Sequence, residues 1–237
     1  MNGKRILAVG AHPDDIEFGC GPLLLDAGER GASISLAVLS RGEAGTFGDR
    51  VAREEEARSA AEMIGADIHF LATAGDTRLR ADLDTTLQVA KLIRRFKPDL
   101  ILSPSPHANQ HPDHRETSRI VRDAYRLARY GKTPGLEDLE PHKTGTFLFY
   151  DISSEALGGA GLTPILVDIS SQVERWKELM QCHASQVSNL DYIDLQLSRA
   201  RTLGIQMGVD AALRVYSEGP LLLGSAEDLM GAKSPRL

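Results

Sequence analysis

Four short apolar segments alternate with helix-like segments through the first 130 residues. The predicted strands and helices follow one another in the order strand 5–11, helix 13–27, strand 33–40, helix 48–66, strand 67–72, helix 82–96, strand 99–104 and helix 111–130. Continuous apolar strands that alternate with helices are typical of a parallel sheet covered on both faces. Because crossover connections are right-handed, such a chain winds in both directions from its first strand. The sequence therefore predicts an α/β fold with a Rossmann-like, mostly parallel sheet and helices on both faces.

The rest of the chain adds further elements of the same kinds. We expect later strands at 145–153 and 163–170, followed by helices at 171–184 and 191–213. A chain of 237 residues is long enough for one large domain. We therefore predict a single α/β domain over 1–237, with its Rossmann-like core at about 1–130 and its C-terminal strands and helices at 145–237.

Two clusters of histidine and aspartate follow the first and fourth predicted strands. The first reads AHPDD (11–15) and the second HPDH (111–114), about a hundred residues later. In the common strand order 3-2-1-4 these two strands are neighbours, and ligands bind at their carboxyl ends where the strand order reverses. We therefore expect the two clusters to lie together in the fold.

The first cluster is not a dinucleotide-binding turn. The turn after the first strand reads GAHPDD, whereas a dinucleotide site requires GxGxxG so that a pyrophosphate can approach the backbone. The two carboxylates would also repel phosphate. A nucleotide cofactor is therefore not expected.

The residue types in the clusters predict a metal site. Pro13 and Pro112 each fit the first position of a helix, and acidic residues in a first helical turn often do no more than complement the helix dipole. That explanation does not account for the imidazoles. Two imidazoles and one carboxylate, with a fourth position for water, are the usual protein ligands of a catalytic zinc ion. His12, Asp15 and His114 supply this set.

The remaining members of the clusters supply the other groups that hydrolysis needs. Asp14 is the candidate general base that takes a proton from the attacking water. His111 is the candidate group that stabilises an oxyanion or protonates the leaving amine. Asp113 is expected to orient His111 or to raise its pKa.

Composition excludes several other classes of function. The net charge is −6 and no basic block stands out, so nucleic acid and anionic membranes are not expected partners. No apolar run approaches the roughly 20 residues that span a bilayer. Cys20 and Cys182 are isolated, so neither a disulfide framework nor a thiolate zinc site is indicated, and the expected location is the cytoplasm.

The motifs resemble those of the zinc-dependent PIG-L or LmbE-like N-deacetylases. The resemblance rests on AHPDD, on HPDH after PDLILSP, on REEEARSAAEMIG (53–65) and on the late VYSEG (215–219), and it is nearest in layout to the bacillithiol-pathway deacetylases. It implies removal of acetate from an N-acetylglucosaminyl compound, with Zn²⁺ or alternatively Fe²⁺ as cofactor and a homo-oligomeric assembly. It also implies the same three metal ligands, Asp14 as base and His111 supported by Asp113.

The resemblance further implies three residues near the substrate, Arg53, Tyr192 and Gln110. The bacillithiol-pathway enzymes, which act on N-acetylglucosaminyl-malate, tend to carry an arginine immediately before HPDH, where a guanidinium suits a malate carboxylate. Gln110 occupies that position here and offers a hydrogen bond without charge. The glycine-containing segment 40–49 is either a loop that closes over substrate or an exposed connection.

Three other functions remain compatible with the motifs. An amidase that acts on thiol S-conjugates would use the same residues. A metal-dependent phosphoesterase would need further carboxylates or cationic phosphate clamps, which are not evident. A non-catalytic metal-binding or sugar-binding domain would lose little function on replacement of Asp14.

Overall fold

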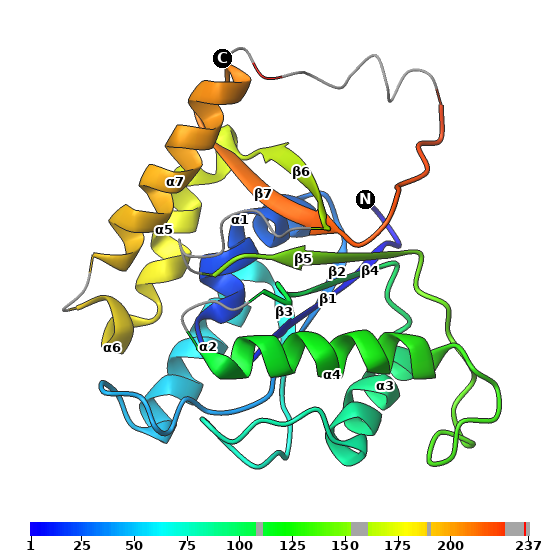
Figure 1. The fold of residues 1–237 in the computed structure, drawn as a ribbon. Helices are drawn as coiled ribbons and strands as arrows, with labels where there is room; N and C mark the ends of the chain where they lie inside the picture. The colour runs from blue at the N-terminus through cyan, green and yellow to red at the C-terminus, as the bar shows by residue number, and fades with distance from the viewer. Residues whose placement is uncertain (108–110, 153–160, 189–190, 226–234, 236–237) are drawn as a thin grey trace.

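The computed structural model describes residues 1–107, 111–152, 161–188, 191–225 and 235, and within them seven strands form one sheet (Figure 1). The elements in chain order are β1 (Arg5–Gly10), α1 (Asp15–Glu29), β2 (Ser33–Val38), α2 (Arg50–Ile64), β3 (Ala66–Phe70), α3 (Leu83–Phe96), β4 (Leu100–Pro104), α4 (Pro112–Ala128), β5 (Thr146–Tyr150), β6 (Thr163–Asp168), the 3-10 turn η1 (Ser170–Gln172), α5 (Val173–Gln181), α6 (Ala184–Val187), α7 (Tyr192–Met207) and β7 (Ala212–Ser217).

The sheet has the order β3-β2-β1-β4-β5-β7-β6. The first five strands in this order run parallel, and β7 runs antiparallel to both β5 and β6. This arrangement confirms the predicted mostly parallel sheet and the predicted order 3-2-1-4. It places β1 directly between β2 and β4, so the strand order reverses where the two histidine clusters emerge.

Helices cover both faces of the sheet, as predicted. On one face α1, α2, α5 and α7 pack together, and on the other face α3 and α4 pack side by side (Figure 1). Alternate side chains of β1 enter the two cores, with Ile6 and Ala8 in the first and Leu7 and Val9 in the second. This two-sided burial is the reason that β1 reads as a continuous apolar run.

The predicted helix 191–213 is wrong at its C-terminal end. Helix α7 ends at Met207, where Gly208 adopts a left-handed conformation with φ of 72° and caps the helix. The following residues form β7, which is inserted between β5 and β6. The predicted helix 171–184 is likewise divided into η1, α5 and the start of α6.

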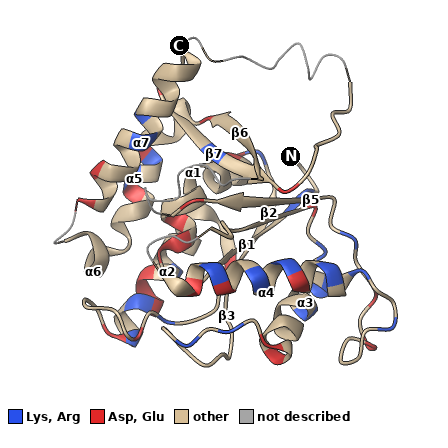
Figure 2. Ribbon diagram, viewed as in Figure 1, with Lys and Arg blue, Asp and Glu red and all other residues tan. Residues whose placement is uncertain are grey.

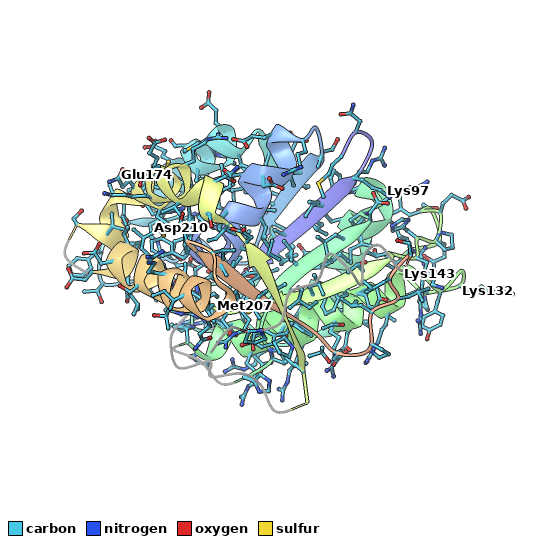
Figure 3. The ribbon with its side chains drawn as sticks, turned by 90° about the horizontal axis from the view of Figure 1, so that it is seen from above. Lys97, Lys132, Lys143, Glu174, Met207 and Asp210 are labelled. Atoms are coloured by element: carbon cyan, nitrogen blue, oxygen red, sulfur yellow. The ribbon has the colours of Figure 1, made fainter. Side chains whose placement is uncertain are left out.

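Helix α4 shows how charged residues are distributed on an outer helix of the fold. Helix α4 carries both basic and acidic residues along its length (Figure 2), and its arginines pair with nearby acids, as Arg119 does with Glu116 at 3.0 Å. Lys97 and Lys143, which precede β4 and β5, lie on the same side of the molecule, at the amino ends of these strands (Figure 3). Among the helices of the described residues, none has the length and apolar character needed to cross a membrane.

Candidate active site

The two histidine clusters meet at the carboxyl ends of β1 and β4. His114 Nε2, at the start of α4, lies 3.0 Å from Asp15 Oδ1, at the start of α1. His12 Nδ1 lies 3.5 Å from the other carboxylate oxygen of Asp15. All three side chains are almost fully buried. The adjacency expected from the strand order is therefore present.

The turn after β1 is held together by the carboxylate of Asp15. Its Oδ2 accepts hydrogen bonds from the backbone N–H groups of Ala11 (2.8 Å) and His12 (2.9 Å). Helix α1 begins at Asp15, and Asp14 precedes it with a positive φ of 104°. The prediction that Pro13 is the first residue of this helix is wrong, because the turn passes through the unusual Asp14 conformation before the helix starts. Such a conformation in a non-glycine residue is uncommon and is often found at functional sites.

The second cluster has the predicted local structure. Pro112 is the first residue of α4 and His111 precedes it, accepting the backbone N–H of Asp113 at its Nδ1 (3.2 Å). Asp113 and His114 then lie in the first turn of the helix. This geometry directs both side chains toward the turn after β1.

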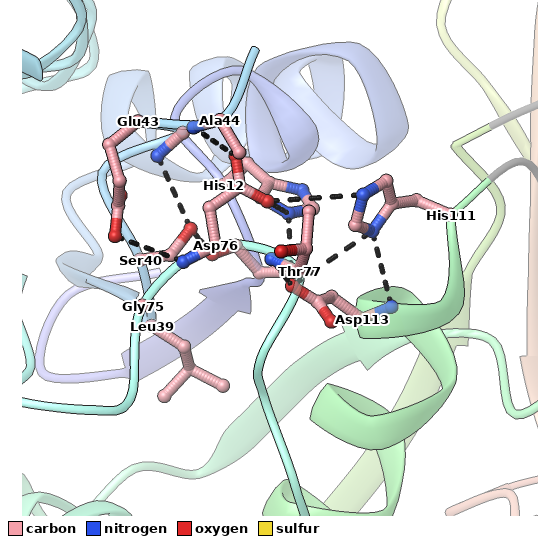
Figure 4. A network of polar contacts seen from close by, with 12 residues as sticks. His12, Leu39, Ser40, Glu43, Ala44, Gly75, Asp76, Thr77, His111 and Asp113 are labelled. Atoms are coloured by element: carbon pink, nitrogen blue, oxygen red, sulfur yellow. Dashed lines mark hydrogen bonds and ion pairs between the residues drawn. The ribbon is translucent and has the colours of Figure 1, made fainter.

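A further carboxylate, which the sequence analysis did not identify, also belongs to the site. Asp76 follows β3, and its Oδ1 lies 3.1 Å from His12 Nε2 and 3.9 Å from His111 Nε2 (Figure 4). The backbone N–H of Ala44 donates to its Oδ2 (3.0 Å), and its own backbone N–H donates to Glu43 (3.0 Å). The position of Asp76 beyond the carboxyl end of a parallel strand was the one signal that could have revealed it.

Asp113 contacts Thr77 and His12 as well as His111. Its Oδ2 accepts the backbone N–H of Thr77 (2.7 Å) and lies 3.5 Å from His12 Nε2, but it is 4.0 Å from His111 Nδ1 (Figure 4). Burial and the neighbouring His12 lower the pKa of His111, although the Asp113 carboxylate acts in the opposite direction. The Asp113 carboxylate therefore accepts a hydrogen bond from the Thr77 backbone, and the Asp113 backbone N–H donates one to His111.

The buried histidines and carboxylates shift each other's pKa values. Burial alone would lower the pKa of the His12 imidazole, but surrounding carboxylates raise it well above its usual value. Burial would raise the pKa of Asp15, but contacts with His114 and His12 hold it well below its usual value. Burial acts in the same way on Asp76, whose pKa His12 nevertheless lowers to about 2. The cluster therefore favours ionised carboxylates.

The pKa of Asp14 is shifted upward, in contrast to those of Asp15 and Asp76. Burial raises the pKa of Asp14 to about 6, against the lowering influence of the Arg53 guanidinium. Its carboxylate accepts a hydrogen bond from Arg53 Nη2 at 3.1 Å. A carboxylate whose pKa lies near neutrality is suited to exchange protons with a substrate.

Arg53 is bonded to the turn that carries Asp14. Besides that carboxylate, its Nη2 donates to the carbonyl of Pro13 (2.7 Å), and its Nη1 donates to the carbonyl of Gly42 (3.0 Å). A Cβ atom at Gly42, where φ is 65°, would lie 2.0 Å from Arg53 Nη1, so only glycine allows this approach. Arg53 is 4% exposed, so it is not a helix-surface residue.

Tyr192 and Gln110 are the other two residues predicted to lie near the substrate. Tyr192 lies at the start of α7 and lines the same cavity as the histidine clusters, with its ring 6.2 Å from that of Phe18. Gln110 lies outside the described residues. The segment 40–49 contributes Ala44, Gly45 and Thr46 to the cavity wall.

The donor set fits a metal ion. Two groups of side chains each offer one nitrogen or oxygen atom per residue, with all these atoms within 4.8 Å of one another. The first group is His12, Asp15 and His114, and the second is His12, Asp76, His111 and Asp113. The first group has the two imidazoles and one carboxylate typical of catalytic zinc. His12 belongs to both groups because one ring nitrogen faces Asp15 and the other faces Asp76. A second ring nitrogen that faces a carboxylate is the usual arrangement around a metal-ligating histidine.

The cavity at these residues has a volume of about 340 Å³. Its lining includes His12, Asp14, Asp15, Arg53, Asp76, His111 and His114. This size is within the usual range for sites that bind small molecules.

Comparison with known proteins identifies the family. The sequence model described as "PIG-L: GlcNAc-PI de-N-acetylase" matches residues 7–125, about half of the chain, including both clusters. The chain belongs to the PIG-L family. The family resemblance inferred from AHPDD and HPDH is thereby confirmed.

Several relatives of this PIG-L family chain match along most of its length. The diacetylchitobiose deacetylase of Thermococcus kodakarensis is 27% identical, over 91% of this chain and 82% of its own. The crystal structure of the conserved protein TT1542 from Thermus thermophilus is 31% identical with a TM-score of 0.81, over 92% of this chain and 96% of that one. The structure of GalB, the 4-carboxy-2-hydroxymuconate hydratase of Pseudomonas putida KT2440, is 26% identical with a TM-score of 0.80, over 94% and 99%.

Replacement of Asp76 tests its part in the site. We expect Asp76→Asn to weaken metal binding or to lower kcat/KM by about 10-fold to 100-fold, as loss of a carboxylate behind a metal-ligating histidine commonly does. Asp67→Asn, at an exposed carboxylate on β3, is the matched control and is expected to leave both unchanged. Metal content and kcat/KM are the two measurements. An Asp76→Asn protein that matches the wild type in both would remove Asp76 from the site.

Proposed function

We propose that this protein is a metal-dependent hydrolase that removes the acetyl group from an N-acetylglucosaminyl substrate. The observation that carries the proposal is the convergence of five side chains in one cavity: His12, Asp14, Asp15, His111 and His114. The family description names a de-N-acetylase, and the relative from Thermococcus kodakarensis is a deacetylase of diacetylchitobiose. Both point to an acetamido sugar as the substrate class.

His12, Asp15 and His114 would hold the metal ion, with Zn²⁺ as the expected metal and Fe²⁺ as the alternative. When bound, such an ion polarises a carbonyl and lowers the pKa of water. Their side chains are buried, and one nitrogen of each histidine lies within 3.5 Å of the Asp15 carboxylate, so the three groups already face one another.

Asp14 and His111 would move the protons. Asp14 takes a proton from the attacking water, and its raised pKa lets it hold that proton until the amine leaves. His111 faces the same cavity with its side chain 31% exposed, so it can reach the acetyl oxygen and stabilise the developing negative charge. Arg53 holds the Asp14 carboxylate in place through its hydrogen bond.

The hydratase GalB supports a second candidate function. Activation of water by the same groups could add it to a carbon–carbon double bond, and GalB matches nearly the whole chain. The substrate in its name carries carboxyl groups, which basic side chains recognise best. In the described part of this cavity, Arg53 is the one arginine or lysine in the lining, and it is already bonded to Asp14. This lining favours the deacetylase.

Acetate release is the experiment that tests the proposal. Zinc-loaded and iron-loaded protein is incubated with N-acetylglucosaminides, with an S-conjugated thiol amide and with 4-carboxy-2-hydroxymuconate, and protein treated with a chelator is the control. We expect acetate and a free amine from the glucosaminides, and no loss of muconate absorbance. Muconate hydration without acetate release would replace the deacetylase by the hydratase, and turnover of the S-conjugate alone would replace it by the amidase.

A further inference from the structure

The lining of the cavity includes apolar side chains beside the metal-binding cluster, by which we mean His12, Asp15 and His114. Phe18, Ile152, Tyr192 and Leu195, which we call the apolar wall, line the cavity together with the groups described above. They come from three separate parts of the fold: α1, the residues after β5, and the first turn of α7. The apolar wall is therefore built by the tertiary structure and is not one face of a single helix.

Leu195 is the most accessible member of the apolar wall. It is 37% exposed, whereas Phe18 is 5% and Ile152 is 9% exposed. The backbone carbonyl of Ile152 accepts a hydrogen bond from Gln196 Nε2 (2.7 Å), which ties the start of α7 to the end of β5 beside Leu195. An apolar side chain held at the mouth of a polar cavity is suited to contact a ligand.

The described lining of the apolar wall contains no arginine or lysine; Arg199, which donates to the carbonyl of Ile152 (3.3 Å), is not part of the cavity lining. Arg53 is the one arginine or lysine in the described lining of the whole cavity, and its bonds go to Asp14, Pro13 and Gly42. The segments 108–110, 153–160 and 189–190, which flank the site in sequence but lie outside the described residues, contain no lysine or arginine. A carboxylate attached to the sugar, such as that of malate, would meet apolar side chains at this wall.

We infer that the group attached to the acetamido sugar of the substrate is uncharged and presents an apolar surface to Leu195 and Ile152. This inference rests on the proposed deacetylase function and specifies its substrate class. The metal-binding cluster would take the acetamido group, and the apolar wall lies within the same cavity, within reach of the group that the sugar carries. Burial of an apolar group against such a wall favours binding in proportion to the area removed from water.

A set of three glycosides tests the inference. The methyl, benzyl and malyl 2-acetamido-2-deoxyglucopyranosides share the reacting acetamido group and differ in the attached group, which is small, apolar or anionic. We expect kcat/KM for the benzyl glycoside to exceed that for the methyl glycoside by about 10-fold, mainly through KM, since a few apolar carbons in a pocket contribute about this much. We expect the malyl glycoside to be the poorest substrate.

Substitutions at Leu195 test whether this side chain causes the preference for the benzyl glycoside. Leu195→Ser should reduce the benzyl-to-methyl ratio of kcat/KM to near one, and Leu195→Arg should raise the malyl glycoside relative to the benzyl one. Ile205, on the same helix and 50% exposed, is outside the cavity lining. Ile205→Ser and Ile205→Arg are therefore the matched controls, and neither should change the ratios.

The two proposals fail in different ways. Absence of acetate release from all three glycosides contradicts the deacetylase, and the inference is then read from binding of the corresponding free-amine glycosides, measured by calorimetry. Tighter binding of the benzyl amine to wild type, lost in Leu195→Ser, supports the apolar wall. A wild-type preference for the malyl glycoside, or equal changes for benzyl and methyl glycosides in Leu195→Ser, overturns it.

Discussion

Replacement of Asp14 by asparagine is expected to lower kcat by about 10³-fold, within the range that general acid–base catalysis contributes. Asparagine retains the size of the side chain and an oxygen that can accept the Arg53 hydrogen bond seen at 3.1 Å. It also tolerates the positive φ of 104° better than most residues. The substitution therefore removes the proton-accepting group and changes little else.

Measurement of metal content distinguishes loss of the general base from loss of the metal ion. Since His12, Asp15 and His114 are unchanged in Asp14→Asn, we expect one metal ion per chain in both proteins, together with an unaltered midpoint of thermal unfolding. Asp26→Asn, at a partly exposed carboxylate on the helix that follows Asp14, is the matched control and should retain full activity. If Asp14→Asn retained more than a tenth of the wild-type kcat, another group would have to be the base. If the metal were lost, Asp14 would belong to the ligand set.

The central part of the site could be predicted from the sequence because two simple rules combine there. AHPDD and HPDH each follow an apolar strand, and the common strand order 3-2-1-4 makes those two strands neighbours. No knowledge of side-chain packing was needed to bring His114 next to Asp15, which the structure places 3.0 Å apart. The residue types then indicated the metal.

Asp76 shows where this reasoning stops. It is a single carboxylate in a loop after the edge strand β3, without the histidine and proline that mark the other two turns. Its side chain is directed by contacts with the backbone of Ala44 and by the bond from its own N–H to Glu43, and both depend on how two loops pack. Strand β7 was missed for a related reason, because its partners β5 and β6 are distant in sequence and only the assembled sheet shows the gap between them.

Arg94 is a buried cation that donates hydrogen bonds to backbone carbonyl oxygens. It is 2% exposed on α3. Its guanidinium donates to five backbone carbonyls at the end of α4 and in the segment that follows: Leu127, Ala128, Tyr130, Leu136 and Leu139. The last carbonyls of a helix have no partner within it and carry partial negative charge, so a cation is stabilised there. Arg94 thus connects α3, α4 and the segment that leads to β5.

We expect Arg94→Leu to lower the free energy of unfolding by about 3–5 kcal/mol, because it removes the hydrogen bonds that one buried, charged donor makes to five carbonyls. Arg94→Lys should have a smaller effect, since an ammonium retains the charge and up to three donors. Arg95→Leu, at the exposed neighbouring position, is the matched control, and we expect a change within about 0.5 kcal/mol. Urea unfolding measures all three variants, and kcat at a temperature where each is folded should match the wild type because Arg94 is not in the cavity lining. An Arg94→Leu protein as stable as the Arg95→Leu protein would mean that the segment after α4 is held by its apolar contacts, such as that of the fully buried Leu136 with the core beneath α3 and α4.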